Sequence, residues 1–224
     1  MNISEIFYSI QGESTFVGKP CIFIRTQGCN LKCKYCDTKY SLNPKQGIEM
    51  SIENIKRKIS CFPTKLIEIT GGEPLLQMDE CINLIEGLDH EYIILIETNG
   101  SIDISRISYT SGVHIIMDIK CPSSGMEKFN NYKNIERLNK EYDELKFVIQ
   151  DDKDFEFMEK ILKRHPYNGT TLIAPVINNK GQLKTTNIEK LANKILQTSS
   201  ELYYGNLRLQ FPLHKYIWGN KRKR

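Results

Sequence analysis

Residues 27–41 read QGCNLKCKYCDTKYS and carry three cysteines, Cys29, Cys33 and Cys36, in the spacing C-x3-C-x2-C. This stretch directly follows an apolar run, CIFIRT at 21–26, which predicts a β-strand. A zinc ion or a cubane iron–sulfur cluster normally takes four protein ligands. Three neighbouring thiols therefore indicate a metal site with one coordination position left for another ligand.

On both sides of this loop, short apolar runs alternate with amphipathic segments. The alternation is typical of βα units around a parallel sheet whose strands are covered on both faces. Six or seven such units predict an α/β fold, a complete or partial TIM-like (βα) barrel, with residues 1–224 forming a single domain. The expected strands are 21–26, 66–70, 92–98, 113–119, 144–150, 171–177 and 207–211, and the expected helices are 52–59 after an N-cap at Ser51, 79–88, 154–164 and 187–197.

Three polar motifs follow the next three expected strands, as the cysteine loop follows the first. They are TGGEPLLQ at 70–77, ETNG at 97–100 and DIKCPSS at 118–124. In a βα barrel the functional site lies at the C-terminal ends of the strands. We therefore expect these motifs and the cysteine loop to lie together at one rim of the barrel.

Composition excludes several classes of function. The chain has 224 residues, 40% of them hydrophobic and 26% charged, which is ordinary for a globular protein. No apolar run approaches the length of a membrane span, and the N-terminus lacks the layout of a signal peptide. We expect a cytoplasmic protein with no membrane partner. Much of the net charge of +4 lies in the terminal NKRKR, so we expect no direct nucleic-acid partner.

The seven cysteines favour metal or redox chemistry in a reducing compartment over a set of disulfides, because three of them are clustered. The other four are expected to be small buried hydrophobic residues. These are Cys21, Cys61, Cys81 and Cys121.

Two interpretations of the triad remain open from the residues alone. A structural zinc site needs a fourth ligand, and a [4Fe-4S] cluster with one open iron needs an external one. Asp37 and Thr38, which follow the last cysteine, are not required by a purely structural zinc site. The histidines available as a fourth zinc ligand, none at a short spacing from the triad, are His90, His114, His165 and His214.

The triad resembles the hallmark of the radical S-adenosylmethionine (SAM) superfamily, C-x3-C-x2-C after the first barrel strand, with an aromatic residue, here Tyr35, before the last cysteine. GGEP at 71–74, after the second expected strand, resembles the segment that receives the SAM amino group in that superfamily. The resemblance implies that the three cysteines hold a [4Fe-4S] cluster and that SAM binds its open iron. The implied SAM contacts are Tyr35, Cys36, Asp37, Gly72, Glu73, Asp118, Ile119 and Lys120.

Finer motifs resemble the 7-carboxy-7-deazaguanine synthase family. They span nearly the whole chain and read IFYSIQGEST, FIRTQGCNLKCKYCDT, TGGEPLL, ETNG and PLHKYIWGNKR. The resemblance implies a carbon–nitrogen lyase of queuosine biosynthesis that converts 6-carboxy-5,6,7,8-tetrahydropterin to 7-carboxy-7-deazaguanine. In the implied reaction a 5′-deoxyadenosyl radical abstracts hydrogen from the substrate, the ring contracts and ammonia leaves.

The same resemblance implies how the substrate is bound. An N-terminal segment contacts the pterin, a C-terminal segment closes over it, and Thr38 ligates Mg2+. A charge such as Arg25 inside an apolar run must face a partner or a cavity, so it either captures the substrate carboxylate or forms an ion pair within the protein. The implied substrate contacts are Ile10, Gln11, Gly12, Glu13, Arg25, Thr70 and His214.

A flavodoxin or ferredoxin is the implied electron donor, and a homodimer is the expected assembly. Two other functions are retained as alternatives. One is a glycyl-radical activase, which is also a radical SAM enzyme but acts on a protein. The other is a non-catalytic zinc module, which predicts a colourless protein that contains zinc and no iron.

Overall fold

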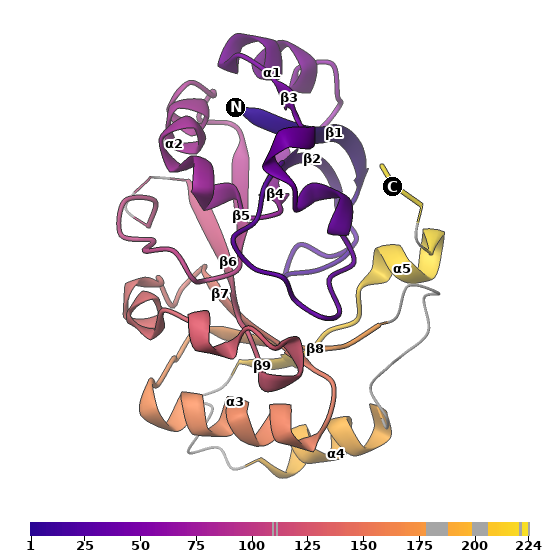
Figure 1. Cartoon of the computed structure of the whole chain (residues 1–224), viewed down its shortest axis with the longest axis vertical. Coiled ribbons are helices and arrows are strands. Elements are labelled where there is room, and N and C mark those ends of the chain that lie inside the picture. Colours follow the sequence, from indigo (N-terminus) through magenta and orange to yellow (C-terminus); the bar gives the residue numbers. More distant parts are fainter. Residues whose placement is uncertain (109, 111, 178–187, 199–205, 220, 224) are drawn as a thin grey trace.

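The computed structural model of the chain describes residues 1–108, 110, 112–177, 188–198, 206–219 and 221–223 (Figure 1). Its strands are β1 (Asn2–Ile10), β2 (Pro20–Thr26), β3 (Ile48–Glu49), β4 (Leu66–Gly71), β5 (Ile93–Thr98), β6 (Val113–Ile119), β7 (Glu144–Ile149), β8 (Thr170–Pro175) and β9 (Leu207–Leu209). Its α-helices are α1 (Ile52–Ile59), α2 (Met78–Glu86), α3 (Asp152–Arg164), α4 (Ile188–Gln197) and α5 (Leu213–Trp218).

All strands form one sheet in the order β3-β1-β2-β4-β5-β6-β7-β8-β9. The strands from β2 through β9 in this order are parallel to one another, whereas β1 is antiparallel to both β2 and β3. Because β3 and β9 remain at opposite edges, the barrel is partial. All seven expected strands are confirmed, and the sequence analysis missed β1 and β3.

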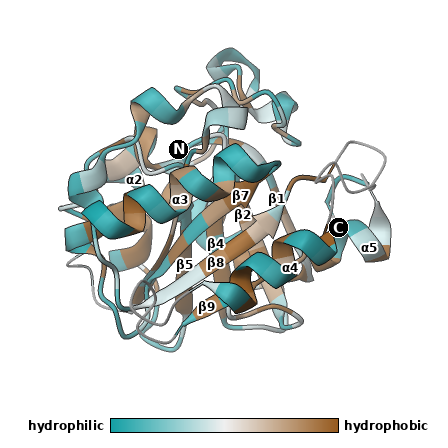
Figure 2. Cartoon of the chain, turned by 90° about the horizontal axis from the view of Figure 1, so that it is seen from below, coloured by the Kyte–Doolittle hydropathy of each residue, from teal (hydrophilic) through white to brown (hydrophobic). Residues whose placement is uncertain are grey.

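The four expected helices are confirmed, although residue 187 of the last lies outside the described residues. Local capping explains two of their starts: the Ser51 hydroxyl accepts a hydrogen bond from the Asn54 N–H at 3.2 Å, and the Asp151 carboxylate accepts one from the Asp154 N–H at 3.2 Å. Helices α3 and α4 cross the apolar strands with their hydrophilic side outward (Figure 2).

The expectation of six or seven βα units is wrong, because two connections between parallel strands contain no α-helix among the described residues. The β6–β7 connection contains short 3-10 helices, η4 (Pro122–Ser124), η5 (Glu127–Phe129) and η6 (Tyr132–Arg137), and the described part of the β5–β6 connection contains turns. Three other short 3-10 helices are η1 (Lys39–Ser41), η2 (Pro44–Gln46) and η3 (Pro74–Gln77).

Alternating side chains of the strands build two cores. The larger core lies between the sheet and the helices and includes Ile22 and Ile24. Phe23, between them, points to the other face and packs with Leu66 and Leu95 in a smaller core inside the partial barrel. The smaller core closes one end of the interior and leaves the C-terminal ends of the strands available for a site.

Three of the scattered cysteines, Cys21, Cys81 and Cys121, are buried as expected. Cys61 is exposed, which contradicts the expectation. It lies just beyond the end of α1, where its thiol donates to the Arg57 carbonyl at 3.4 Å. The periodicity that places Ile55 and Ile59 against the sheet does not extend to this position.

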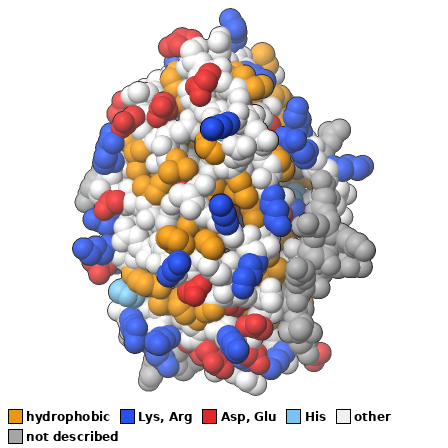
Figure 3. Space-filling view, viewed as in Figure 1, with side chains coloured by type: hydrophobic (Ala, Val, Ile, Leu, Met, Phe, Trp, Pro, Cys, Tyr) orange, Lys and Arg blue, Asp and Glu red, His pale blue; other side chains and the backbone are white. Residues whose placement is uncertain are grey.

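Charged side chains of both signs are interspersed with apolar ones on the face seen in Figure 3. Among the described residues, no helix has the length and apolar character needed to cross a membrane.

Candidate active site

A cavity of about 260 Å³ opens at the C-terminal ends of the parallel strands. It is bounded by the cysteine loop, by the turn after β1 and by residues just before and within α5. The sequence-predicted site residues that line it are Ile10, Gln11, Gly12, Glu13, Arg25, Cys29, Cys33, Tyr35, Cys36, Asp37, Thr38, Thr70, Gly72, Asp118, Lys120 and His214. The structure therefore brings together residues that are up to two hundred positions apart in sequence.

The cysteine loop is fixed by backbone hydrogen bonds. Gly28 N–H donates to the Ser41 carbonyl at 2.7 Å, Cys29 N–H to the Leu42 carbonyl at 3.2 Å, and Cys36 N–H to the Cys33 carbonyl at 3.2 Å. All three thiols are partly buried and line the same cavity. The Cys29 sulfur also accepts the Leu31 N–H at 3.4 Å, a type of contact that tunes iron–sulfur clusters.

In the described part of the chain, no three His, Cys, Asp or Glu side chains are placed so that they could hold a single metal ion. A cubane cluster does not require the three thiolates to converge on one metal ion, because each thiolate ligates its own iron. Three soft thiol donors facing one cavity therefore fit a [4Fe-4S] cluster by their chemistry. Of the histidines, His214 lines the cavity, whereas His114 and His165 pack against aromatic rings elsewhere.

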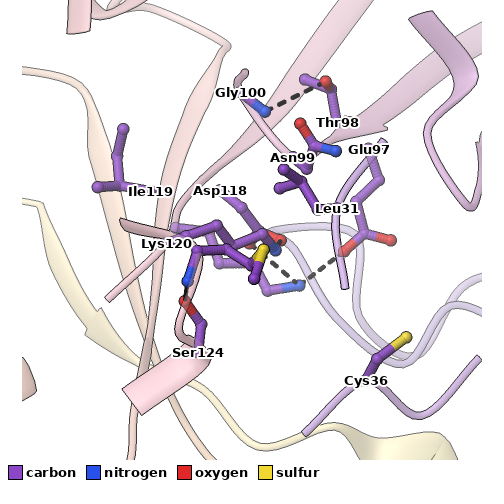
Figure 4. A network of polar contacts seen from close by, with 12 residues as sticks. Leu31, Cys36, Glu97, Thr98, Asn99, Gly100, Asp118, Ile119, Lys120 and Ser124 are labelled. Atoms are coloured by element: carbon purple, nitrogen blue, oxygen red, sulfur yellow. Dashed lines mark hydrogen bonds and ion pairs between the residues drawn. The ribbon is translucent and has the colours of Figure 1, made fainter. Parts of the chain in front are cut away.

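Two buried polar atoms beside the triad have no hydrogen-bond partner among the residues that the structure describes. They are the Tyr35 hydroxyl and Oδ1 of Asp118, and both residues line the cavity. The other oxygen of Asp118 accepts from the Lys120 ammonium at 2.5 Å (Figure 4). Oδ1 of Asp118 lies 3.9 Å from the Lys146 ammonium, which is too far for a hydrogen bond. Because buried polar atoms are almost always hydrogen-bonded, these two fit a polar ligand such as SAM.

Ile119, the middle residue of the predicted SAM-contacting segment, lies with its side chain in the large core, 1% exposed. Figure 4 shows it pointing away from Asp118 and the cysteine loop. Its side chain does not line the cavity, because successive residues of β6 alternate between the two faces of the sheet.

Glu73 is fully buried, and its carboxylate is used within the protein. It accepts from the Thr98 hydroxyl at 2.7 Å, from the Asn99 N–H at 2.6 Å and from the Leu75 N–H at 3.0 Å. Burial raises the pKa of Glu73 to about 7, against the effect of these donors. Since Glu73 does not line the cavity, the geometry gives it the task of tying the GGEP turn to the ETNG segment.

Gly72 allows that turn to touch the cysteine loop. A Cβ at this position would lie 2.1 Å from the Gly28 carbonyl oxygen and 2.5 Å from its carbon. Both are backbone atoms, which cannot move aside as a flexible side chain can. The glycine is therefore required for close approach of the two backbones.

We expect Gly72→Ala to destabilise the fold by about 1–3 kcal/mol, as overpacking does elsewhere, and to lower the iron bound on reconstitution. Gly87→Ala is the matched control, because Gly87 ends α2 with a negative φ that alanine can adopt and does not line the cavity. Thermal unfolding and iron content measure both effects. Equal unfolding temperatures and iron contents for the two variants would contradict the packing argument.

Arg25 lies directly opposite Glu5 in the antiparallel β1–β2 pair, and its Nε donates to Glu5 Oε1 at 3.0 Å. Glu5 is 5% exposed and also accepts from the Tyr40 hydroxyl at 2.8 Å. Arg25 also lines the cavity. Both sequence interpretations of this charge are therefore compatible: an internal ion pair orients a guanidinium that faces the site.

The sequence analysis missed a buried lysine among the site residues. The Lys146 ammonium, on β7, contacts the carboxylates of Glu13 and Glu97 and lies 3.9 Å from Asp118. Although burial raises the pKa of Glu97, Lys146 outweighs it and lowers that pKa to about 2. The available signal was the one used for Arg25, a charge in an apolar run: Glu97 interrupts IILIET and Lys146 interrupts ELKFVI.

The C-terminal segment of the chain around α5 borders the cavity. Leu213 N–H donates to the Gly12 carbonyl at 2.9 Å, and Lys215 pairs with Asp37 at 2.7 Å. A Cβ on Gly12 would lie 2.1 Å from His214 Nδ1, so this glycine lets the imidazole approach the backbone. Burial lowers the pKa of His214, which favours its neutral form.

Two hydroxyls complete the predicted set. The Thr70 hydroxyl donates to Glu97 Oε2 at 3.0 Å. Thr38 lies at the start of η1, but its hydroxyl makes no capping hydrogen bond there and lies 3.7 Å from the Cys36 sulfur. An ordinary capping role therefore does not account for Thr38.

Comparison with known proteins first defines the class. The sequence model of the Radical SAM superfamily matches residues 23–145, from β2 to β7. The crystal structure of QueE from Escherichia coli shares the fold, with a TM-score of 0.71 and 22% identity over 93% of each chain. Streptococcus suis SuiB, solved with S-adenosylmethionine bound, has a TM-score of 0.57 and 14% identity, over 83% of this chain and 48% of that chain. The fold and the cysteine triad are those of a radical SAM enzyme.

Curated relatives narrow the class. The 7-carboxy-7-deazaguanine synthase of Chlorobaculum tepidum is 39% identical over 222 residues, which cover 97% of this chain and 94% of the relative. That of Methanospirillum hungatei is 37% identical over 218 residues, or 97% of this chain and 85% of the relative. The chain belongs to the 7-carboxy-7-deazaguanine synthase family.

Proposed function

We propose that the chain converts 6-carboxy-5,6,7,8-tetrahydropterin to 7-carboxy-7-deazaguanine with loss of ammonia, as a radical SAM lyase of queuosine biosynthesis. The observation that carries the proposal is the cavity itself. Cys29, Cys33 and Cys36 line the same space as Arg25 and the Glu13–Lys146–Glu97 group. A thiol triad and a charged, hydrogen-bonding pocket are thus within reach of one small polar substrate.

The three cysteines would hold a [4Fe-4S] cluster, and Tyr35, Gly72, Asp118 and Lys120 would contact SAM. When bound and reduced, the cluster and SAM supply the one-electron chemistry that activates the substrate C–H bond. Asp118 and Lys120 form an ion pair that would present a carboxylate and an ammonium to the amino-acid end of SAM. The remaining SAM residues of the proposal are Cys36, Asp37, Ile119 through its backbone, and Glu73 through the turn that it holds.

The substrate would bind on the other side of the cavity. Arg25, oriented by Glu5, would bind the substrate carboxylate, and Glu13 would accept N–H groups from the pyrimidine edge. The chain would act as one domain, 1–224, with the N-terminal turn and the α5 segment closing over the substrate. The other substrate contacts of the proposal are Ile10, Gly12, Thr70 and His214, together with Gln11 through the backbone of the turn that its side chain holds.

We assign a Mg2+ ligand role to Thr38, whose hydroxyl faces the cavity without a capping task. Mg2+ binds hard oxygen donors and retains waters, so one hydroxyl and substrate oxygens are a suitable ligand set. Thr38→Ala is expected to raise the Mg2+ concentration for half-maximal rate roughly tenfold or more, while Thr38→Ser keeps it near wild type. Indistinguishable Mg2+ titrations of the two variants would remove the assignment.

The proposal includes a flavodoxin- or ferredoxin-type electron donor, because the cluster needs an external electron. It also includes a homodimer, the commonest assembly of oligomeric proteins, and a cytoplasmic location, where thiols stay reduced. Sedimentation of the reconstituted enzyme would test the dimer.

The proposed function is tested by an anaerobic assay of iron-reconstituted protein with SAM, reductant, Mg2+ and 6-carboxytetrahydropterin, followed by mass spectrometry. We expect 7-carboxy-7-deazaguanine to form and to vanish when SAM is omitted. Cleavage of SAM without this product would point instead to another radical SAM activity, such as a glycyl-radical activase. A colourless zinc protein that leaves SAM intact would exclude the whole proposal.

A further inference from the structure

Glu68 is a buried acid that the proposed reaction does not use. It is 5% exposed, lines the cavity and interrupts the apolar strand LIEIT. Its neighbours in the sheet are apolar, Phe23 on β2 and Leu95 on β5. Among the described residues it forms no ion pair, although burying an acid without a cation is costly. An acid buried at this position is therefore expected to have a specific role in the site.

Glu68 is hydrogen-bonded to the turn that follows β1. Gln11 Nε2 donates to Glu68 Oε2, and Gln11 Oε1 accepts the Glu13 N–H at 3.1 Å. Gln11 is 2% exposed. Both ends of its amide are therefore already engaged within the protein. The side chain connects strand β4 to the backbone of the turn rather than standing free for a ligand.

The turn that Gln11 holds carries groups from two sides of the cavity. The Glu13 carboxylate contacts the Lys146 ammonium on β7, and the Gly12 carbonyl accepts from Leu213 at the start of α5. A continuous series of polar contacts thus crosses the cavity floor from Glu68 on β4, through Gln11 and Glu13, to β7. Both of its ends are fixed, because β4 and β7 are interior strands of the sheet.

We propose that Glu68 is a positioning residue: by holding the Gln11 amide it fixes the turn 11–13 and sets where the Glu13 carboxylate meets Lys146 and the substrate. This inference rests on the proposed function, since it names the residue that orients the substrate-binding turn of that same site.

The charges around Glu68 support the assignment. Burial, followed by the nearby carboxylate of Glu97, raises the pKa of Glu68 to about 8. The titratable groups that face it from neighbouring elements are Cys21 and Arg25 on β2, Glu97 on β5, Lys146 on β7 and Glu13 in the turn. This raised pKa favours the uncharged, protonated form of the acid near neutral pH. Its ionisation would add another carboxylate to those that already surround Lys146.

Three variants test the inference. Glu68→Ala removes the acceptor and leaves a buried amide donor unpaired, Glu68→Gln keeps an uncharged acceptor of similar shape, and Asp143→Asn is the matched control. Asp143 is also a buried acid, 2% exposed, but it accepts the Ile115 and Asn139 N–H groups away from the cavity. The measurements are kcat and KM of the reconstituted enzyme for the pterin from pH 6 to pH 9, and hydrogen exchange of the Glu13 amide.

We expect Glu68→Ala to raise KM roughly tenfold to hundredfold with little change in kcat, and to speed exchange at Glu13. Glu68→Gln should restore KM near neutral pH. Wild type should lose kcat/KM above about pH 8 more steeply than Glu68→Gln, because only wild type gains a charge there. Asp143→Asn should retain the wild-type KM and pH profile.

The inference is overturned if Glu68→Ala leaves KM and Glu13 exchange at wild-type values, or if Glu68→Gln has the same KM defect as Glu68→Ala. It is also overturned if wild type and Glu68→Gln lose kcat/KM in parallel above pH 8. If wild type forms no deazaguanine, the proposed function fails, and exchange at Glu13 still decides whether Glu68 fixes the turn.

Discussion

Replacing Cys33 with serine is expected to remove the cluster and to lower turnover by at least about a thousandfold. Iron in a cubane prefers soft thiolate ligands, and a serine hydroxyl is a hard, weakly acidic substitute. Changes in groups that merely contact metal ligands already cost roughly tenfold to hundredfold, so the loss of one of the three proposed cysteine ligands should cost more. Iron content, visible absorbance and SAM cleavage under anaerobic conditions measure the effect.

Cys61→Ser provides the matched control. Cys61 is exposed beyond α1, does not line the cavity, and makes its hydrogen bond to the Arg57 backbone. This variant should bind iron, absorb visible light and cleave SAM as wild type does. A Cys33→Ser protein that keeps its iron and cleaves SAM at the control rate would show that Cys33 is not a cluster ligand.

The sequence predicted the parallel part of the sheet well because its strands are buried on both faces. Runs such as LIEIT and YIILIET are almost continuously apolar, a pattern that sequence periodicity identifies easily. Strand β1, NISEIFYSI, was missed because it is an antiparallel strand with mixed burial and a buried glutamate, Glu5. The acid fits there because its partner Arg25 lies opposite, a fact of register that no local pattern contains.

The candidate site, like the sheet, was predicted only in part from the sequence. The cysteine triad, GGEP and ETNG were found because short motifs carry their own spacing. Lys146 and Glu68 were missed, although each is a charge in an apolar run, because their roles depend on partners that lie 49 or more residues away in the sequence. For Glu73 the motif predicted the position correctly, but only the fold reveals that its carboxylate binds Thr98 and Asn99.

Replacing Lys146 with methionine is expected to destabilise the protein by about 3 kcal/mol, because breaking a buried ion pair leaves uncompensated charge behind. The Lys146 side chain is 6% exposed, while its partners Glu13 and Glu97 are 26% and 28% exposed toward the cavity. Partial access to water places the cost at the lower end of the usual range for buried pairs. For a chain of this size the unfolding temperature should fall by roughly 6–12 °C.

Lys65→Met is the control that separates the loss of the buried ion pair from the general effect of replacing a lysine with methionine. Lys65 pairs with Glu91 at 3.3 Å, but the two side chains are 52% and 76% exposed, so this surface pair should add little to stability. Adding Glu97→Gln to Lys146→Met removes one of the stranded charges and should recover part of the lost stability. Turnover should remain low in both Lys146 variants, because Glu13 has lost the cation that holds its carboxylate. If Lys146→Met unfolds at the same temperature as Lys65→Met, the buried ion pair does not stabilise this site.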